Sequence, residues 1–137
     1  MAIIWRDSMS VDNIKIDEDH KHLISLLNSV EKQLENPEDT ASLQKTFAQL
    51  KIYTIEHFQR EEILQLRIRF PKAAEHKRIH RTLVKQLDSI ITSVKAKGIA
   101  AQAEDISALL RRWLIDHVLQ EDMPMKPYFA KFSSDLS

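Results

Sequence analysis

Histidines at helical spacing are the feature that most constrains this fold. The chain has 137 residues and six histidines, and five of the six lie on the apolar seams of stretches with helical periodicity. His57 precedes Glu61 by four residues, and His76 precedes His80 by four. Side chains four residues apart share one face of an α-helix, about 6 Å apart along its axis. Buried without partners, they would cost several kcal/mol, so the fold must provide partners for them.

The chain contains four long stretches of helical periodicity, separated by clear breaks. We predict helices at about residues 17–35, 38–68, 72–97 and 101–121, with breaks at Asn36-Pro37, Phe70-Pro71, Gly98 and Pro124. The only glycine is Gly98, which disfavours β-rich and glycine-loop folds. The fold class expected is all-α: one domain over residues 1–137, an up-down-up-down antiparallel four-helix bundle. We expect two additions to the bundle: an N-terminal arm at residues 1–16 and a short C-terminal helical turn near residues 125–132.

Each predicted helix carries a seam of residues spaced alternately by three and four, as in packed antiparallel helices. Five histidines and Glu61 lie on these seams. In such a bundle, the starts of the first and third helices share an end with the finishes of the second and fourth. The seam residues therefore converge on one end of the core: His20, His57, Glu61, His76, His80 and His117.

Imidazole and carboxylate groups converging in a core predict a metal site. Five imidazoles exceed the four ligands of one structural zinc, so they suit a pair of metals. A second carboxylate near His117 would come from Glu121, four residues on, or from Asp122, five residues on. Regular helix geometry favours Glu121, whereas Asp122 requires the last turn to loosen before Pro124. Spacing alone leaves both open. His22 and Glu62 lie off the main seams, and we interpret both as non-ligating.

Taken in order, the motifs H, HxxxE, HxxxH and HxxxxD resemble the hemerythrin family. They stand at His20, His57 to Glu61, His76 to His80, and His117 to Asp122, and the resemblance runs from Trp5 to Phe129. It implies a metal site formed by His20, His57, Glu61, His76, His80, His117 and Asp122, with the two carboxylates bridging. The resemblance therefore favours Asp122 over Glu121 as the second carboxylate ligand.

The resemblance further implies a cofactor and a function. The cofactor would be two iron ions (Fe2+/Fe3+) joined by an oxo or hydroxo bridge, with one coordination position left open for dioxygen. The function expected is reversible dioxygen binding for carriage, storage or delivery, rather than enzymatic turnover. The alternatives are a di-iron redox enzyme that reduces peroxide or nitric oxide, and an oxygen or iron sensor on the same scaffold. Apolar walls of the oxygen pocket are expected from Phe58, Trp113, Leu114 and Val118, which neighbour the ligands.

A ferritin-like oxygenase fits the residues poorly. Those sites are rich in carboxylates and carry Glu-x-x-His on two helices, a motif that this sequence lacks. Three positions depart from what the hemerythrin family often shows: Asp19 stands where glutamine is frequent, Phe70 where tyrosine is common, and Gln65 where methionine is frequent. None is a ligand position, although a polar Gln65 near the site would alter ligand access or the autoxidation rate.

Composition limits the partners. Formal net charge is zero, from 20 basic and 20 acidic residues, so no strong attraction to nucleic acid or anionic membranes is expected. The chain has no cysteine, no bilayer-length apolar run and no signal-peptide pattern. We expect a cytoplasmic monomer. Basic residues around the second-to-third helix connection form either a solvated face or a docking surface for an acidic redox protein: Arg60, Arg67, Arg69, Lys72, Lys77, Arg78 and Arg81.

Overall fold

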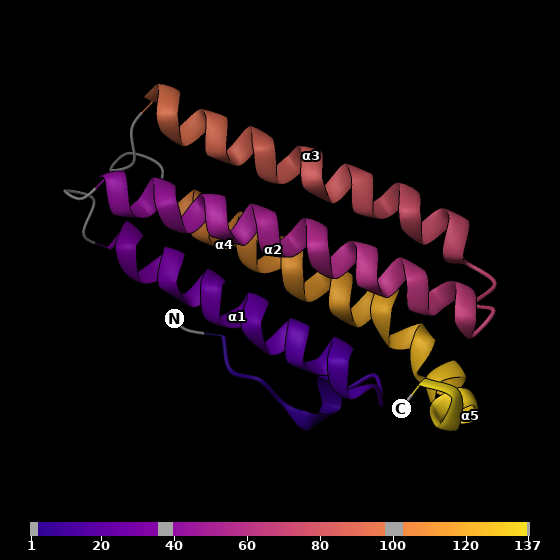
Figure 1. The fold of residues 1–137 in the computed structure, drawn as a ribbon. Coiled ribbons are helices and arrows are strands. Elements are labelled where there is room, and N and C mark those ends of the chain that lie inside the picture. Colours follow the sequence, from indigo (N-terminus) through magenta and orange to yellow (C-terminus); the bar gives the residue numbers. More distant parts are fainter. Residues whose placement is uncertain (1–2, 36–39, 98–102, 137) are drawn as a thin grey trace.

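Four long helices pack lengthwise in the computed structural model, which describes residues 3–35, 40–97 and 103–136. They are α1 (Ile14–Leu34), α2 (Thr40–Arg67), α3 (Ala73–Lys97) and α4 (Ala103–His117). α1 lies beside α2 and α4, and α2 lies beside α3 (Figure 1). The predicted four-helix bundle is thus confirmed, and the described residues contain no strand. Nowhere in these ranges is a helix long and apolar enough to cross a bilayer.

The first helix begins three residues before the expected Asp17, at Ile14. Its start is fixed by Asn13, whose side chain accepts the Ile16 N–H at 3.0 Å, a common N-cap contact. The Asp17 carboxylate instead holds the N-terminal arm, because it accepts the Ser10 hydroxyl at 2.5 Å and the Val11 N–H at 2.9 Å. The arm, which includes the short 3₁₀ helix η1 (Asp7–Met9), runs back along α1.

The turn between α2 and α3 brings two site-bearing helices together. Arg69 has a positive φ of 55°, and the Phe70 N–H bonds the Gln65 carbonyl at 2.9 Å, the six-to-one bond of a Schellman cap. α2 therefore ends where the Phe70-Pro71 pair predicts. The breaks predicted at Asn36-Pro37 and Gly98, and the predicted starts at residues 38 and 101, lie outside the described residues.

The end of α4 is irregular. After His117 the chain is wound as a π-helical turn, η2 (Val118–Asp122), then as a 3₁₀ turn, η3 (Met123–Met125). Pro124 has no backbone N–H to continue an α-helix. The last helix, α5 (Lys126–Leu136), is longer than the short turn expected at residues 125–132, and it crosses the end of the bundle (Figure 1).

Two apolar clusters lie on either side of a buried polar layer. The larger fills the bundle and includes Leu27, Phe47, Leu87 and Leu110, each fully buried or nearly so. The smaller closes the end that α5 crosses, and we call it the end cluster: Val11, Ile16, Ile68, Phe70, Met125 and Phe129. The polar layer between them holds the predicted site residues, which are therefore shielded from solvent on both sides.

Candidate metal centre

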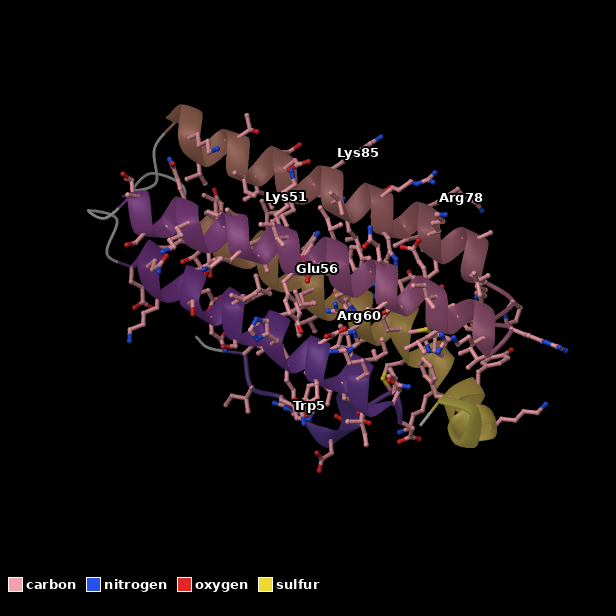
Figure 2. All side chains as sticks on the ribbon, viewed as in Figure 1. Trp5, Lys51, Glu56, Arg60, Arg78 and Lys85 are labelled. Carbon is pink, nitrogen blue, oxygen red and sulfur yellow. The ribbon has the colours of Figure 1, made fainter. Side chains whose placement is uncertain are left out.

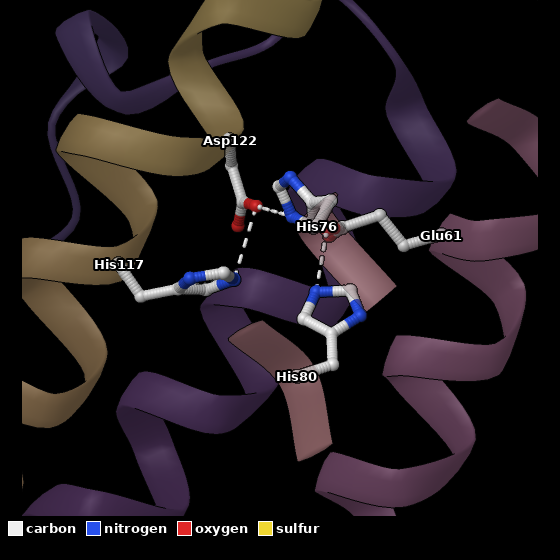
Figure 3. Close-up of side chains that lie close together, drawn as sticks. All are labelled: Glu61, His76, His80, His117 and Asp122. Carbon is white, nitrogen blue, oxygen red and sulfur yellow. Dashed lines mark hydrogen bonds and ion pairs between the residues drawn. The ribbon is translucent and has the colours of Figure 1, made fainter. Parts of the chain in front are cut away.

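The buried histidines and carboxylates form two groups that share Glu61 and Asp122. Within each group, one potential ligand atom per residue lies within 4.8 Å of all the others. The larger group, drawn in Figure 3, adds His76, His80 and His117 to the shared carboxylates, and the smaller adds His20 and His57. The arrangement thus offers two adjacent sets of ligand atoms that share both carboxylates, one with three histidines and the other with two.

All seven predicted metal-binding residues are brought together, and they come from every long helix. His20 lies on α1, His57 and Glu61 on α2, and His76 and His80 on α3. His117 ends α4, and Asp122 closes the π turn, so the loosening that the five-residue spacing requires is present. The wider turn places Asp122 on the face of His117, because five residues make little more than one π turn. All seven side chains are buried: none exceeds 5 % exposure.

The Nε2 atom of each histidine faces one or both carboxylates. His76 Nε2 lies 2.8 Å from a Glu61 oxygen and 2.8 Å from an Asp122 oxygen. His57 Nε2 is 3.0 Å from Glu61, and His20 Nε2 is 3.0 Å from Asp122. Two further Nε2–carboxylate distances complete the layer: His80 to Glu61 at 3.1 Å and His117 to Asp122 at 3.1 Å.

Metal ions would satisfy the nitrogen and oxygen atoms of this layer better than hydrogen bonds among them do. Despite these short distances, Nε2 of His20, His57, His76 and His117 forms no hydrogen bond with any residue that the structure describes, nor do Glu61 Oε2 and both Asp122 oxygens. Buried polar atoms in proteins are nearly always hydrogen-bonded. Cations placed between these imidazoles and carboxylates would satisfy all of these atoms at once, and neutral imidazole with carboxylate is a ligand set suited to iron.

Electrostatics within the layer favour positive charge. Burial alone would lower the pKa of His20, but contacts with Asp122 and Glu61 outweigh burial and raise that pKa to about 10. The pKa of His76 rises to about 10 for the same reasons. Burial would raise the pKa of Glu61, yet the surrounding histidines hold it well below its usual value, and His117 and His20 lower that of Asp122. The two carboxylates therefore remain anionic and attract cations.

Asp19 is a functional candidate that the sequence interpretation missed. In sequence Asp19 is only a departure from a frequent glutamine, yet its side chain is fully buried and accepts a hydrogen bond from His57 Nδ1 at 2.9 Å. Arg60 donates to it through Nε at 2.8 Å and Nη2 at 3.0 Å, and the Tyr53 hydroxyl donates at 2.7 Å. Burial would raise the pKa of Asp19, but these partners lower it, so Asp19 orients His57 as a carboxylate.

Glu62 is the second missed residue. We interpreted it as a non-ligating neighbour of Glu61, and it does lie outside the two groups of candidate ligands. However, its carboxylate contacts His80 Nδ1 at 3.0 Å. Histidine ligands of metals commonly donate their other ring N–H to a carboxylate, which fixes the tautomer and the ring orientation.

The sequence did contain a pattern that could have identified Asp19. Its three partners on α2, Tyr53, His57 and Arg60, are spaced by four and three residues and so lie on one helical face.

A small cavity of about 10 Å³ adjoins the two-histidine position. The four predicted wall residues all line it: Phe58, Trp113, Leu114 and Val118. The only indole N–H in these walls is that of Trp113. It donates to the Leu83 carbonyl at 2.9 Å and therefore points away from the cavity. Outside it, Leu83, Trp113 and His117 also line an open groove of about 520 Å³ between α3 and α4.

Two residues considered in the sequence are not part of the polar layer. Glu121, the alternative to Asp122, is half-buried and lines the outer α3–α4 groove. His22 is exposed, with its ring centroid 4.2 Å from that of Tyr53. Both placements agree with the choice of Asp122 and with the interpretation of His22.

Comparisons with known proteins agree with this architecture. The model of the hemerythrin HHE cation-binding domain family matches residues 13–129. The chain is 27 % identical to the bacteriohemerythrin of Stenotrophomonas maltophilia over 124 residues, covering 88 % of this chain and 76 % of that one. It is 26 % identical over 123 residues to the bacteriohemerythrin of Campylobacter jejuni, with 90 % and 92 % covered, and 24 % identical over 120 residues to that of Pseudomonas aeruginosa, with 88 % and 76 % covered.

Proposed function

The chain belongs to the hemerythrin HHE cation-binding family, and from this we propose that it binds dioxygen reversibly at a pair of non-haem iron ions. Its role would be that of an oxygen carrier or store in the cytoplasm. The relatives named above are bacteriohemerythrins, which supports the assignment at the level of the family. The observation that supports dioxygen binding beyond family membership is the small apolar cavity beside one half of the polar layer.

We propose that seven residues hold the irons. Glu61 and Asp122 would bridge both ions, because each belongs to both groups of ligand atoms. Three histidines would hold one ion and two, His20 and His57, the other, so the second ion would have one fewer protein ligand and could take a further one. Two ferrous ions held there would supply the electrons with which dioxygen binds and would recover them on its release. The cavity lies nearer the two-histidine position, since both of its histidines, His20 and His57, line it, whereas His117 is the only lining histidine of the other group.

The protein's contribution is to orient ligands and to exclude water. Asp19 and Glu62 accept the Nδ1 protons of His57 and His80, leaving each Nε2 to face the metal. Phe58 stacks on His80 with ring centroids 3.8 Å apart, which holds that imidazole from its other face. Val118 and Leu114, buried in the cavity wall, keep solvent from the open position.

The same walls favour reversible binding over reduction. Reducing peroxide or nitric oxide consumes protons, and an enzyme would place a donor within hydrogen-bond reach of the bound molecule. Apart from the proposed ligands, the lining contains apolar side chains and the Trp113 indole, whose N–H is bonded to Leu83. No acid is thus available in the cavity, which argues for the carrier over the redox enzyme.

Reduction of the iron-loaded protein without oxygen, followed by air, tests this function directly. A carrier should develop a visible charge-transfer band on oxygenation and lose it when oxygen is removed, over repeated cycles. Immediate passage to a stable ferric spectrum would contradict reversible binding. Sustained turnover of peroxide or nitric oxide with an added electron donor would favour the enzyme.

A further inference from the structure

A long groove runs along the outer side of α2 and α3, separated from the proposed oxygen cavity by Phe58, which lines both. It consists of two adjoining hollows of about 400 and 480 Å³, both of which include Gln59 and Glu62. We call it the α2/α3 groove. The remaining residues that the argument uses are Ile63 and Leu66 from α2 and Lys77, Arg81 and Lys85 from α3.

The α2 side of the groove carries apolar residues that face solvent. Ile63 is 54 % exposed and Leu66 is 73 % exposed. Ile52, 59 % exposed, lies on the same helix two heptads before Leu66. Seven-residue spacing keeps such residues on one helical face. Four other apolar residues of this helix are instead buried in the core, Leu43, Phe47, Leu50 and Phe58. A solvent-facing apolar row that reaches a groove therefore indicates a surface used for contact.

The α3 side is positively charged. Lys77, Arg81 and Lys85 are spaced by four residues, so they form one row along the helix, and Lys85 projects outward from α3 in Figure 2. None of the three forms an ion pair with any other residue that the structure describes. The one carboxylate that lines the groove, Glu62, is engaged with His80. In a chain with zero formal net charge, this row is a local excess of positive charge.

The floor of the groove reaches the metal centre. His80 and Phe58 line the groove, and the Glu62 carboxylate, 24 % exposed, joins solvent to His80 Nδ1. His80 Nε2 lies 3.1 Å from Glu61. A molecule seated in the groove would therefore lie against His80, a proposed iron ligand, and against the Glu62 carboxylate that contacts its Nδ1.

We propose that the α2/α3 groove is the docking site for an acidic, one-electron carrier protein that returns the oxidised centre to its ferrous form. The inference rests on the proposed function, because an oxygen carrier needs such a reductant after autoxidation. In each encounter the carrier loses one electron and one ferric ion becomes ferrous, so two encounters restore the centre. The apolar row would pack against the partner, and the cationic row would pair with its carboxylates.

Charge distinguishes this occupant from a second copy of the chain. A symmetric dimer would place the same patch on both partners, bringing Lys77, Arg81 and Lys85 of one copy close to the same residues of the other. Like charges at an interface are unfavourable. An acidic partner instead meets the positive row with complementary charge, which also accelerates association at low salt.

The test compares two double variants that change net charge equally. Lys77→Glu/Arg81→Glu reverses the groove, and Lys32→Glu/Lys45→Glu reverses exposed lysines elsewhere on α1 and α2. The probe is a reduced plant-type [2Fe–2S] ferredoxin, a small acidic carrier, mixed by stopped flow with the oxidised iron-loaded protein at low and high salt. We expect the groove variant to lose at least about ten-fold in rate constant at low salt and to lose most of the salt dependence. The control should change less than about two-fold.

Two further measurements make the result decisive. Leu66→Ser, at an exposed position, should weaken ferredoxin binding several-fold in a titration monitored by NMR line broadening, without loss of thermal stability. Equal rate losses in the two double variants, or no loss in either, would overturn the docking site. Loss of a wild-type dimer in the groove variant during size exclusion would assign the groove to self-association and equally overturn the proposal. The oxygen cycle of the groove variant, measured separately, shows whether the proposed function stands.

Discussion

The Asp19 carboxylate lies 2.9 Å from Nδ1 of His57 and joins that histidine to three other donors on α1 and α2. Arg60 and Tyr53 bond the carboxylate from α2, and Lys15 lies 3.8 Å away on α1. A buried carboxylate with this many donors is fixed in position. The geometry of the two-histidine metal position therefore depends on a residue that touches no metal in the proposed site.

Removing the charge of Asp19 should weaken metal binding. Asp19→Asn preserves side-chain volume but replaces a strong acceptor with a weaker one, so His57 loses its preferred tautomer. We expect iron affinity at this position to fall by about ten- to a hundred-fold, measured by competition with a chelator. The matched control is Glu18→Gln, the exposed neighbour, which should bind iron as the wild type does. Equal affinity in both variants would contradict the orienting role.

A hydroxyl in the cavity wall should shorten the life of the oxygenated protein. Val118→Thr is nearly isosteric and would put a donor beside the open position, speeding conversion to the ferric form several-fold. Val94→Thr, buried at a distance from the site, serves as the control. Both should cost about 1–3 kcal/mol of unfolding free energy for the buried hydroxyl. Autoxidation followed by visible absorption should rise only in Val118→Thr, and an equal rise in both would point to general loosening.

The metal-stripped protein should lose stability as pH rises. The folded-state pKa values of His20 and His76 are raised from 6.5 to about 10, so the folded state binds more protons than the unfolded state within that window. Their contribution is complete below about pH 6.5 and is lost towards pH 10. The melting temperature should fall across this window without metal and change less with metal, which replaces the protons. Calorimetry at pH 7 in two buffers should also detect proton release when metal binds.

Replacing Gln65 should stabilise the fold. The side chain is fully buried, and among residues 3–35, 40–97 and 103–136 it donates only to the Met125 sulfur, at 3.2 Å, while its Oε1 has no hydrogen-bond partner there. Gln65→Met removes the unpaired oxygen and retains the volume, so the free energy of unfolding should rise by about 1 kcal/mol, measured by urea denaturation. Gln59→Met, at an exposed position, should leave it nearly unchanged. A loss of stability in Gln65→Met would show that the amide has a partner, such as bound water.

Helical periodicity predicted the bundle and gathered the candidate ligands, because seam positions are buried whatever the finer geometry. It did not find Asp19 or Glu62, since both lie off the seams and act only through the rotation of a neighbouring imidazole. The predicted helix start at residue 17 is three residues late, because Asn13 caps the helix at Ile14. Spacing also left Glu121 and Asp122 open, because a π turn cannot be deduced from regular helix geometry.

The end cluster sets a lower limit on how short a working version of this protein could be made. The last proposed ligand is Asp122, yet Met125 and Phe129 beyond it are fully buried against Ile16 and its neighbours. A chain cut after Asp122 would keep every ligand and lose the lid over them. An engineer grafting this centre into another bundle would therefore need to carry α5 along with the seven proposed ligands.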